Sequence, residues 1–356
     1  MSAKQPAPEI VRVPLAACPP VPLPGTESTG SKLPVAPWTL AADRFDRSSG
    51  SVRRPLVTVA IVNWNTRDLL RGCLASLPWG SPALGLDVVV VDNASRDDSA
   101  ALVRREFPQV RLIHNRANVG FVRANNQALA AGRGDHFLML NSDTEVQAGA
   151  IETLVAAIAA APGCGAVGPR LLNSDGSIQG SAGMFPRMRQ RFAPGVLEAA
   201  YAAELEHRLA AGGGRAAVDW LCGAAVLTTR AVLNRVGPLD ERYFMWYDDV
   251  DWSRKLARAG LARLLVAQAV IVHHGRQSGG QLANRVLAEQ LWRSEYTYLR
   301  LNDGRLAAAA AWSLRVAKAG CNWLTASSPE ARAEAAWRLA AHRRLRPELG
   351  QGILRA

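Results

Sequence analysis

The chain contains short polar clusters whose residue types could bind a cation or accept a proton. In "LNSDTEV", residues 140–146, Asn141 and Asp143 follow an apolar run. Asn, Ser and Asp are common turn formers, so one interpretation is a turn that ends a strand. The other is an oxygen site for Mg²⁺ or Mn²⁺, because these hard cations bind carboxylates and complete their coordination with waters and substrate phosphates. The residue types alone leave both interpretations open.

A second cluster is "WYDDVDW", residues 246–252, which contains Asp248, Asp249 and Asp251. Acids are favourable at a helix N-terminus, where they interact with the helix dipole. That interpretation accounts for one or two of the acids but not for the aromatic residues around them. Aromatic neighbours can desolvate a carboxylate and raise its pKa, which suits a general base. We therefore favour a catalytic role for this cluster.

Two further motifs give weaker evidence for a metal or phosphate site. "VHHGRQS", residues 272–278, places His273 and His274 after an apolar strand. A histidine there is often structural, but near the carboxyl end of a strand one of the two becomes a candidate ligand for a metal or a phosphate. "NVGFVRANNQ", residues 118–127, is either a plain loop entering a helix or a helix start whose N–H groups hold a phosphate. No P-loop or GxGxxG motif is present, so neither a P-loop kinase nor a Rossmann dehydrogenase is predicted.

The elements that must position these clusters alternate between strand and helix. Dense β-branched runs predict buried strands, and apolar residues at helical spacing predict the helices between them. The predicted strands lie in 55–65, 86–92, 110–115 and 136–143, and the helices in 66–77, 95–107 and 118–132. This alternation predicts an α/β fold with a doubly wound, mostly parallel sheet. Ligands bind at the carboxyl ends of such strands, so the polar clusters at 63–66, 92–95 and 141–143 should converge.

The rest of the chain is less regular. From the sequence we expect an Ala-rich helix at 150–161, loop with short helices at 170–215, a strand and then a helix at 218–237, an acidic turn opening a helix at 243–260, and a strand that ends at the two histidines.

The composition limits the partners and the compartment. The 356 residues carry a net charge of +12, which favours anionic partners such as nucleotide diphosphates, phospholipid headgroups or nucleic acid. The 5 cysteines are dispersed without a CxxC pair, which fits a reducing cytosol. The sequence shows neither a secretory signal nor an apolar run of about 18 residues, so we expect a cytoplasmic protein without a transmembrane helix.

Taken together, the motifs resemble those of a known enzyme family. In chain order they are "VTVAIVNWN", "VVVVDNASRDDS", "NVGFVRANNQA", "LNSDTEV", "GAAVLTTRAV", "GPLDERYFMWYDDVDWSRKLARAG" and "VHHGRQS". They resemble inverting family 2 glycosyltransferases, and among these the rhamnosyltransferase-like branch of bacterial cell-wall and O-antigen assembly. The resemblance covers about residues 55 to 280. It implies a GT-A fold, a nucleotide-sugar donor and a divalent cation.

The resemblance also implies roles for single residues on the donor side. Asp92 would contact the base of the nucleotide, Asn63 and Asn65 the nucleoside, and Asn118 and Gly120 the region of the ribose and sugar. The full implied set of donor residues is Asn63, Asn65, Asp92, Asn93, Asn118, Gly120 and Asn141.

The remaining implied roles concern the metal and the reaction. Asp143 matches the last acid of the family's Asp-x-Asp metal motif, and Asn141 stands in place of the first, which implies a weaker hold on the cation. His273 is implied as a further metal or diphosphate ligand, with His274 as its alternative. Asp249 matches the catalytic base, and Asp248 replaces the Glu before it. The candidates on the acceptor side are Trp220, Gly223, Trp246 and Asp251.

These observations predict three regions, which are a disordered Pro-rich tail at 1–54, a GT-A domain at 55–284 and a helical region at 285–356. Within the last, residues 305–324 carry Trp312, Trp323 and basic residues on an apolar background. This helix either packs in the core or rests on an anionic membrane leaflet. The second alternative would suit a polyprenyl-diphosphate-linked acceptor and a peripheral position at the inner face of the plasma membrane.

The expected donor is dTDP-rhamnose, ahead of UDP-hexoses, UDP-galactofuranose and GDP-sugars. Two rival hypotheses come from other classes of protein. A polyanion- or nucleic-acid-binding protein would explain the net charge, but the basic residues are dispersed and no helix-turn-helix, RRM or zinc motif is present, so we expect no nucleic-acid partner. A nucleotidyltransferase would need a basic, Gly-rich loop after the first strand, where the sequence has "NWNTRDLL". The sequence does not indicate an oligomeric state.

Overall fold

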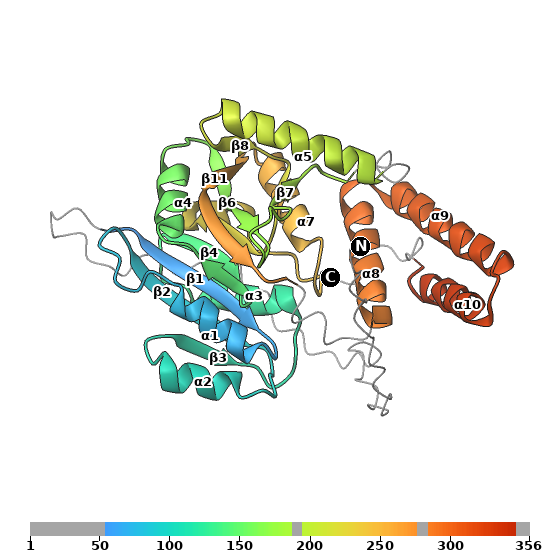
Figure 1. The fold of residues 1–356 in the computed structure, drawn as a ribbon, viewed down its shortest axis with the longest axis horizontal. Coiled ribbons are helices and arrows are strands. Elements are labelled where there is room, and N and C mark those ends of the chain that lie inside the picture. The colour runs from blue at the N-terminus through green and yellow to red at the C-terminus, as the bar shows by residue number, and fades with distance from the viewer. Residues whose placement is uncertain (1–53, 187–193, 276–283, 347–356) are drawn as a thin grey trace, which may run out of the picture. The chain divides into compact units, whose positions relative to one another are not determined.

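A computed structural model describes residues 54–186, 194–275 and 284–346 (Figure 1). The predicted disordered tail at 1–54 lies outside these residues except for Arg54, and so does Ser278 of the histidine motif.

The first half of the described chain forms the predicted parallel sheet. Its strands are β1 (Leu56–Asn63), β2 (Gly85–Asp92), β3 (Arg111–His114) and β4 (His136–Asn141), in the spatial order β3-β2-β1-β4. β1 pairs in parallel with both β2 and β4, and β2 with β3. The helices that follow β1, β2 and β3 are α1 (Arg67–Ala75), α2 (Ser99–Glu106) and α3 (Phe121–Ala131). Apolar residues of α1 and α2 pack on one face of the sheet and those of α3 on the other, which is why the strands are apolar on both faces.

The second half extends this sheet with strands of mixed direction. β10 (Ala225–Thr229) lies antiparallel between β4 and β6 (Cys164–Leu172). β11 (Ala262–His273) pairs in parallel with β6 and antiparallel with β5 (Thr144–Val146) and β8 (Arg215–Ala217). The helices of this half are α4 (Ala150–Ala159), α6 (Arg230–Val236) and α7 (Asp248–Arg258), and β7 (Ala182–Gly183) pairs with β9 (Trp220–Leu221) in a separate small sheet.

One predicted segment is wrong. Residues 170–215, expected to be loop with short helices, contain the long helix α5 (Pro194–Ala211). Its Ala, Leu and Glu residues are strong helix formers, and Leu205 and Leu209 are buried in the core. Gly, Pro and Arg residues surround this helix. The segment was therefore predicted to be a loop, because clusters of Gly and Pro usually indicate loops.

The C-terminal region is helical, as predicted. It consists of α8 (Asn284–Asn302), α9 (Arg305–Leu324) and α10 (Pro329–Arg344), and α10 begins with a Ser328 cap followed by proline. The Trp312 indole donates to the carbonyl of His342, which joins α9 to α10. Arg254 of α7 forms a 2.8 Å ion pair with Asp303, so the region is anchored to the sheet domain. Among the described helices, none combines the length and the apolar character needed to cross a membrane.

Candidate donor, metal and catalytic site

The carboxyl ends of β1 and β2 place the predicted nucleotide residues side by side. Asn63 pairs with Asp92 in the parallel register, and its amide nitrogen donates to Oδ1 of Asp92 at 3.2 Å and to Oγ of Ser95 at 3.1 Å. The other oxygen of Asp92 accepts from the Ser95 amide at 3.2 Å and lies 3.0 Å from Nδ1 of His114. Asp92 is only 1% exposed. Its carboxylate therefore holds the strand-end loops in place, and a contact with a nucleotide base stays a prediction.

Asparagine side chains also order the loops that follow β1, β2 and β3. Asn93 donates to Oδ1 of Asn118 at 2.8 Å, and the same oxygen accepts from the amide of Gly120 at 2.9 Å. Gly120 has φ +91°, and a Cβ there would lie 2.7 Å from the ring of Phe244. Asn65, also at positive φ, accepts from the amide of Arg96. These loops thus lie at one edge of the sheet, and Gly120 brings them against the segment that leads into α7.

The predicted metal residues come together from two distant strands. Asp143 follows β4, and His273 ends β11. Oδ1 of Asp143 lies 3.3 Å from Nε2 of His273, and Nδ2 of Asn141 lies 3.4 Å from the same nitrogen. His274, the alternative ligand, instead contacts Ser174 through Nδ1 and Glu145 through Nε2. The structure therefore groups Asn141, Asp143 and His273, and directs His274 elsewhere.

The hydrogen bonds of Gln179 determine which nitrogen of His273 carries its proton. The Gln179 amide nitrogen donates to the carbonyl of His273 at 3.1 Å and to Oδ1 of Asn173 at 2.8 Å, so its oxygen must be the atom that faces Nδ1 of His273 at 2.6 Å. That oxygen can only accept, so Nδ1 bears the hydrogen. Nε2 is then the ring atom that faces Asp143 and the amide nitrogen of Asn141, and a metal would bind it in its unprotonated form.

This arrangement fits a divalent cation. Unprotonated Nε2 and the Asp143 carboxylate are two acceptors close together, so a cation between them would be favourable. The buried Oδ1 of Asn141 has no hydrogen-bond partner within the described chain, and it is a third suitable donor atom. No cluster of three or more His, Cys, Asp or Glu suited to a metal occurs in the described ranges. The protein therefore supplies few donor atoms, and substrate oxygens or waters must complete the coordination.

The two adjacent acids Asp248 and Asp249 open α7. The turn before them is strained, because Trp246 and Tyr247 have φ of +63° and +62°. Oδ2 of Asp249 accepts from the amide of Gly223 at 3.0 Å, and Oδ1 accepts from the amide of Val250 at 2.8 Å. Burial raises the pKa of Asp249 despite these two bonds. The pKa of Asp248 is also raised, first by burial and then by the charge of Asp249.

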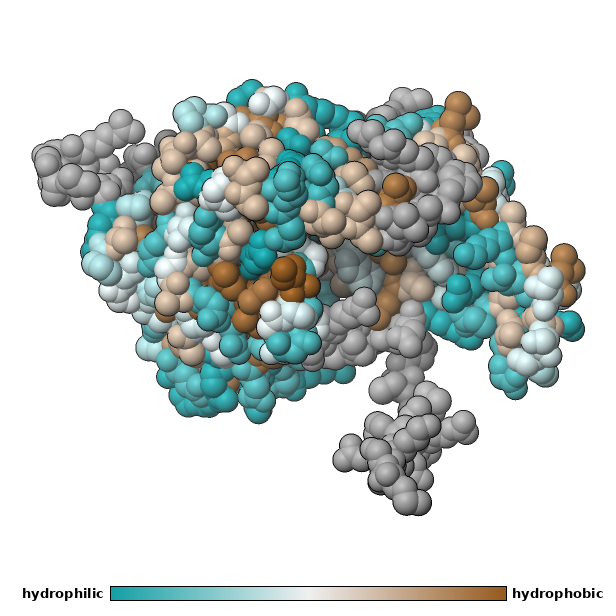
Figure 2. All heavy atoms as spheres, turned by 45° about the horizontal axis from the view of Figure 1, so that its top comes forward, coloured by the Kyte–Doolittle hydropathy of each residue, from teal (hydrophilic) through white to brown (hydrophobic). Residues whose placement is uncertain are grey.

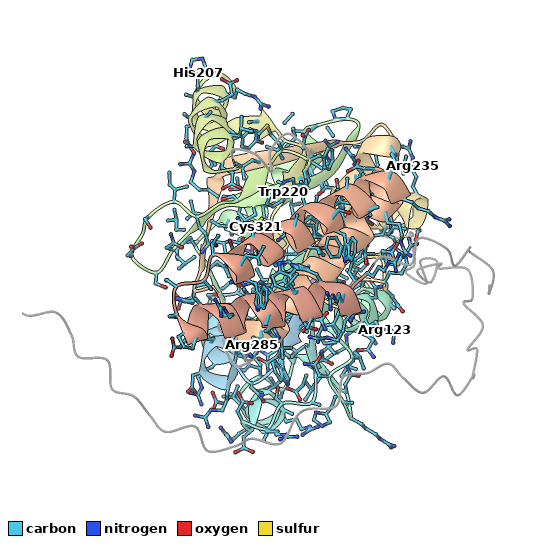
Figure 3. All side chains as sticks on the ribbon, turned by 90° about the vertical axis from the view of Figure 1, so that its right-hand side faces the viewer. Arg123, His207, Trp220, Arg235, Arg285 and Cys321 are labelled. Carbon is cyan, nitrogen blue, oxygen red and sulfur yellow. The ribbon has the colours of Figure 1, made fainter. Side chains whose placement is uncertain are left out.

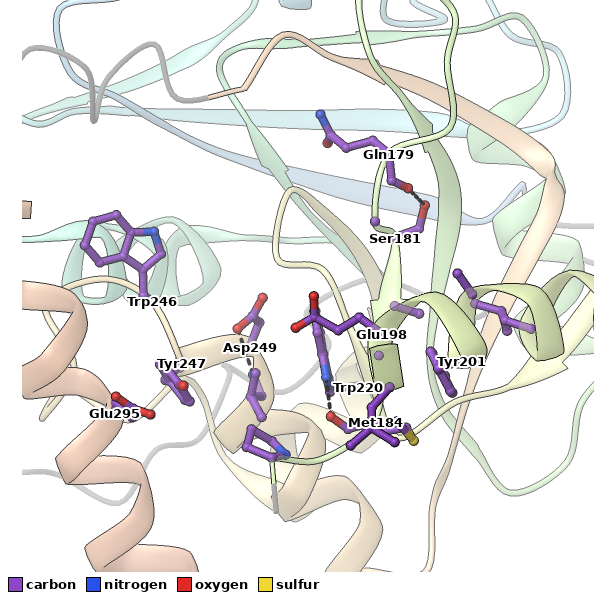
Figure 4. Close-up of a pocket in the computed structure, with 18 of the residues that line it drawn as sticks. Gln179, Ser181, Met184, Glu198, Tyr201, Trp220, Trp246, Tyr247, Asp249 and Glu295 are labelled. Carbon is purple, nitrogen blue, oxygen red and sulfur yellow. Dashed lines mark hydrogen bonds between the residues drawn. The ribbon is translucent and has the colours of Figure 1, made fainter. Parts of the chain in front are cut away.

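Asp249 lies in a cavity of about 1400 Å³ (Figure 4). Trp220, Trp246 and Tyr247 also line this cavity, and so does Gln179, which holds His273. Asn141, Asp143 and His273 do not line this cavity, but Gln179 both lines it and contacts His273.

The half-buried thiol of Cys222 lies near both acidic clusters. The pKa of Cys222 is raised to about 12, first by burial and next by the charge of Asp249, with smaller contributions from Asp248 and Asp143. Carboxylates from α7 and from the end of β4 thus act on the same sulfur. The two acidic clusters that the sequence separates by about 100 residues are therefore both near enough to Cys222 to affect its pKa, and a single site stays a prediction.

Comparisons with known proteins agree with this geometry. The model of glycosyl transferase family 2 matches residues 58–199. A Mycobacterium tuberculosis protein named N-acetylglucosaminyl-diphospho-decaprenol L-rhamnosyltransferase is 30% identical over 278 residues, which cover 73% of this chain and 89% of that protein. This chain belongs to glycosyl transferase family 2. Its membership makes the chain a glycosyltransferase and sets aside the rival nucleotidyltransferase and polyanion-binding hypotheses.

More distant relatives of this family 2 glycosyltransferase are larger proteins. The O-antigen biosynthesis protein RfbC of Myxococcus xanthus is 25% identical over 254 residues, which cover 68% of this chain and 19% of that protein. The solved structure of GalNAc-T7 with UDP, GalNAc and Mn²⁺ matches with a TM-score of 0.50 and 17% identity, covering 82% of this chain and 55% of that chain. The structural likeness shows the fold, which is the predicted GT-A fold.

The predicted acceptor-side residues of the family 2 enzyme do not all lie together. Trp220 and Trp246 line the cavity, and Gly223 touches Asp249 through its amide. Asp251 does not line it. Its Oδ1 accepts from the hydroxyl of Tyr243 at 3.2 Å and from the amide of Asn302 at 2.8 Å, which ties α7 to α8. The structure therefore places Asp251 in a supporting position away from the cavity.

Two polar residues of this site were missed in the sequence. Ser95 was not among them, because it belongs to the cluster at 92–95 that was predicted to meet the cluster at 63–66, and it contacts Asn63. Gln179 and Glu198 had no such signal. Gln179 lies 94 residues before His273, and Glu198 lies on the unexpected helix α5 and lines the cavity. Only the folded chain brings them to the site.

Proposed function

We propose that this family 2 glycosyltransferase transfers rhamnose from dTDP-rhamnose to a hydroxyl of a lipid-linked glycan, with inversion at the anomeric carbon. The observation that carries the proposal is that Asp249 lines one cavity together with Gln179, the residue that orients His273 beside Asp143. The sugar and the acceptor class are supported by the name of the mycobacterial relative, which specifies an L-rhamnosyltransferase and a diphospho-decaprenol.

In the proposed reaction Asp249 is the general base. An alcohol is a poor nucleophile, so a carboxylate within reach of its proton accelerates attack by about 10²–10⁴-fold. The amides of Gly223 and Val250 hold one oxygen each of Asp249 and so orient the carboxylate toward the cavity. Its raised pKa makes it a stronger base than an exposed aspartate. The acceptor oxygen bonds to the anomeric carbon as the nucleoside diphosphate leaves from the opposite face, which inverts the configuration.

Asp143, His273 and Asn141 are the residues that would hold the Mg²⁺ or Mn²⁺ ion. When bound, such an ion neutralises charge that develops on the departing diphosphate. The residues of this chain prepare the site. Gln179 keeps the proton of His273 on Nδ1, and burial of Asp143 keeps competing water away.

The donor nucleotide is proposed to lie over the carboxyl ends of β1 and β2. Asn63, Asp92 and Ser95 form one hydrogen-bonded unit there, and Asn93 and Asn118 hold the adjoining loop. Gly120 has no side chain, so this loop can pack closely against Phe244 in the segment that leads to Asp249. We also propose that Trp220 and Trp246 face the acceptor sugar, because flat aromatic surfaces suit sugar rings.

The proposed place of the reaction is the cytoplasmic face of a membrane. The described cysteines Cys73, Cys164, Cys222 and Cys321 are free thiols, which suits a reducing compartment. A lipid-linked acceptor would bring the enzyme into contact with the leaflet that carries it.

The experiment combines a panel of donors with one acceptor. The full chain is incubated with dTDP-rhamnose, UDP-hexoses, UDP-galactofuranose or GDP-sugars, with N-acetylglucosaminyl-diphospho-prenol and with Mn²⁺ or Mg²⁺. We expect rapid release of dTDP from dTDP-rhamnose only when the acceptor is present, and NMR of the product should show the inverted anomeric configuration. Retention of configuration, or a preference for another donor, would contradict the proposal.

A further inference from the structure

Helix α9 exposes an apolar stripe to solvent. Leu306 is 87% exposed, Leu324 72% and Leu314 47%. These leucines share one side of the helix with smaller exposed residues at the helical spacings expected for a single face. The stripe consists of Leu306, Ala310, Leu314, Ala317, Cys321 and Leu324. Figure 2 shows apolar side chains, in brown, over the C-terminal helices, and Figure 3 turns α9 toward the viewer with Cys321 labelled.

The opposite side of α9 is already used for packing. Ala308, Ala311 and Ala319 are buried, and the Trp312 indole donates to the carbonyl of His342. The helix therefore packs its alanines against the core and exposes its larger leucines to solvent. Because large exposed apolar side chains in a row are uncommon on a monomeric protein, the stripe indicates a contact surface.

The charges of α9 indicate what it contacts. The helix contains Arg305, Arg315 and Lys318 but neither Asp nor Glu. Arg315 pairs with Glu295 of α8, whereas Lys318 has no ion pair among the described residues. Lys318 beside the apolar stripe, on a helix without acids, matches an anionic lipid surface, where the leucines enter the interface and the cation meets headgroups. A second copy fits less well, because two α9 stripes in contact would bring their basic residues together.

The same helix forms a wall of the catalytic cavity. Leu314, Arg315 and Lys318 line the cavity that contains Asp249, and so does Leu291 of α8. Across the cavity α5 contributes apolar side chains, including Leu197 and Leu205. The cavity thus extends from the catalytic candidate to the helix with the exposed stripe, between walls that suit the apolar chain of a lipid.

We propose that α9 lies flat on an anionic phospholipid leaflet, so that the lipid-linked acceptor passes from the bilayer along α9 into the cavity. The membrane contact stands on the stripe alone, while the passage of the acceptor rests on the function proposed above. In this arrangement the diphosphate of the acceptor meets Lys318, and its terminal sugar reaches Asp249.

The test is vesicle cosedimentation of the full chain, using phosphatidylcholine vesicles with and without phosphatidylglycerol. The variant is Leu306→Glu/Leu324→Glu, whose positions do not line the cavity. The matched control is Ala333→Glu/Ala340→Glu, which adds the same charge at exposed alanines of α10. Circular dichroism and thermal melting of both variants report whether they fold.

We expect the wild type to bind the anionic vesicles and to dissociate as salt rises. The α9 variant should bind at least about tenfold more weakly than the α10 control, because it loses apolar insertion in addition to charge. Equal binding by the two variants would overturn the proposal, as would a wild-type dimer that the α9 variant converts to monomer. If the α9 variant fails to fold, Leu306→Ser/Leu324→Ser replaces it, with Ala333→Ser/Ala340→Ser as its control, and the same comparison decides.

Transfer assays then separate this inference from the proposed function. With a short-chain acceptor in solution, the α9 variant should release nucleoside diphosphate at the wild-type rate. With a long-chain acceptor embedded in anionic vesicles, its rate should fall about tenfold. Equal rates in vesicles would contradict entry from the leaflet, whereas absence of transfer by every form of the protein would refute the proposed function and leave the binding result intact.

Discussion

Replacing Asp249 by asparagine tests the central role in the proposed reaction. The carboxamide keeps the shape of the side chain but cannot take a proton from the acceptor. A positioned general base contributes about 10²–10⁴-fold, so we expect kcat to fall by this factor, which corresponds to about 2.7–5.4 kcal/mol of barrier. Donor affinity should stay near the wild-type value, because Asp143, His273 and the donor loops are unchanged.

The structure also predicts how this variant affects stability. The two oxygens of Asp249 accept from the amides of Gly223 and Val250, and asparagine has only one oxygen. One amide therefore loses its acceptor, which costs about 1–3 kcal/mol. In the opposite direction, the variant removes a carboxylate whose charged form burial disfavours, as its raised pKa shows. The two effects oppose each other, so we expect the free energy of unfolding to change by less than about 2 kcal/mol.

The assay measures single-turnover transfer and, separately, donor binding by calorimetry. In the wild type, kcat/KM should decline as pH falls through the raised pKa of Asp249, since the base must be ionised. The residual kcat/KM of the Asp249→Asn variant should not show this decline at low pH. If donor affinity and transfer fell by the same factor, or if the variant kept more than about a tenth of the wild-type rate, Asp249 would not be the base.

Three further predictions concern the surroundings of the site. The pKa of Asp248 is raised by burial, so its native state binds a proton more tightly than the unfolded chain, and stability should fall as pH rises from about 4 through the native pKa. Asp248→Asn should therefore be more stable than the wild type by a margin that grows with pH, as measured by urea unfolding. Gln179→Leu should weaken Mn²⁺ binding by about 10–100-fold in calorimetry, because it removes the acceptor that orients His273. Gly120→Ala should lower the free energy of unfolding by about 2–4 kcal/mol, since it combines positive φ with a clash against a phenyl ring.

Controls for these predictions come from neighbouring positions. Ile178→Ala, beside Gln179, should leave Mn²⁺ affinity unchanged. An equal loss of Mn²⁺ affinity in Ile178→Ala and Gln179→Leu would show that the orientation of His273 by Gln179 is not the cause. Gly149 also has positive φ but meets no atom within 4 Å, so Gly149→Ala should cost only about 1 kcal/mol. Equal costs at Gly120 and Gly149 would show that the contact with Phe244 is not important. A stability margin of Asp248→Asn that does not change with pH would contradict the raised pKa.

Much of the parallel half of the fold was predictable from local patterns. The β-branched runs around Val59 and Val90 are apolar on both faces, and the helices between the strands carry apolar residues at regular spacing. Parallel strands joined by helices must end at the same edge of a sheet, so Asn63, Asp92 and Asn141 could be placed together before any coordinates were known. The structure confirms this arrangement of the strands.

The second half was less predictable. A strand within 218–237 was expected, but not the antiparallel place of β10 between β4 and β6, because direction depends on the path of the whole chain. Helix α5 was wrongly expected to be loop, although its own residues favour a helix. Asp251, two positions after Asp249 in sequence, was predicted to be an acceptor-side residue. On a helix, residues two positions apart point in different directions, and Asp251 points toward α8.

The sequence by itself determined the family motifs, the parallel strands near the donor loops and the residue types suited to a cation and a base. Those properties depend on local spacing, which a linear chain displays directly. Only the tertiary structure decided that His273 meets Asp143, that Gln179 directs the proton of His273, and that the cavity of Asp249 reaches α9. Each of these contacts joins segments that are distant in sequence, and their meeting depends on how the second half of the sheet and the C-terminal helices pack.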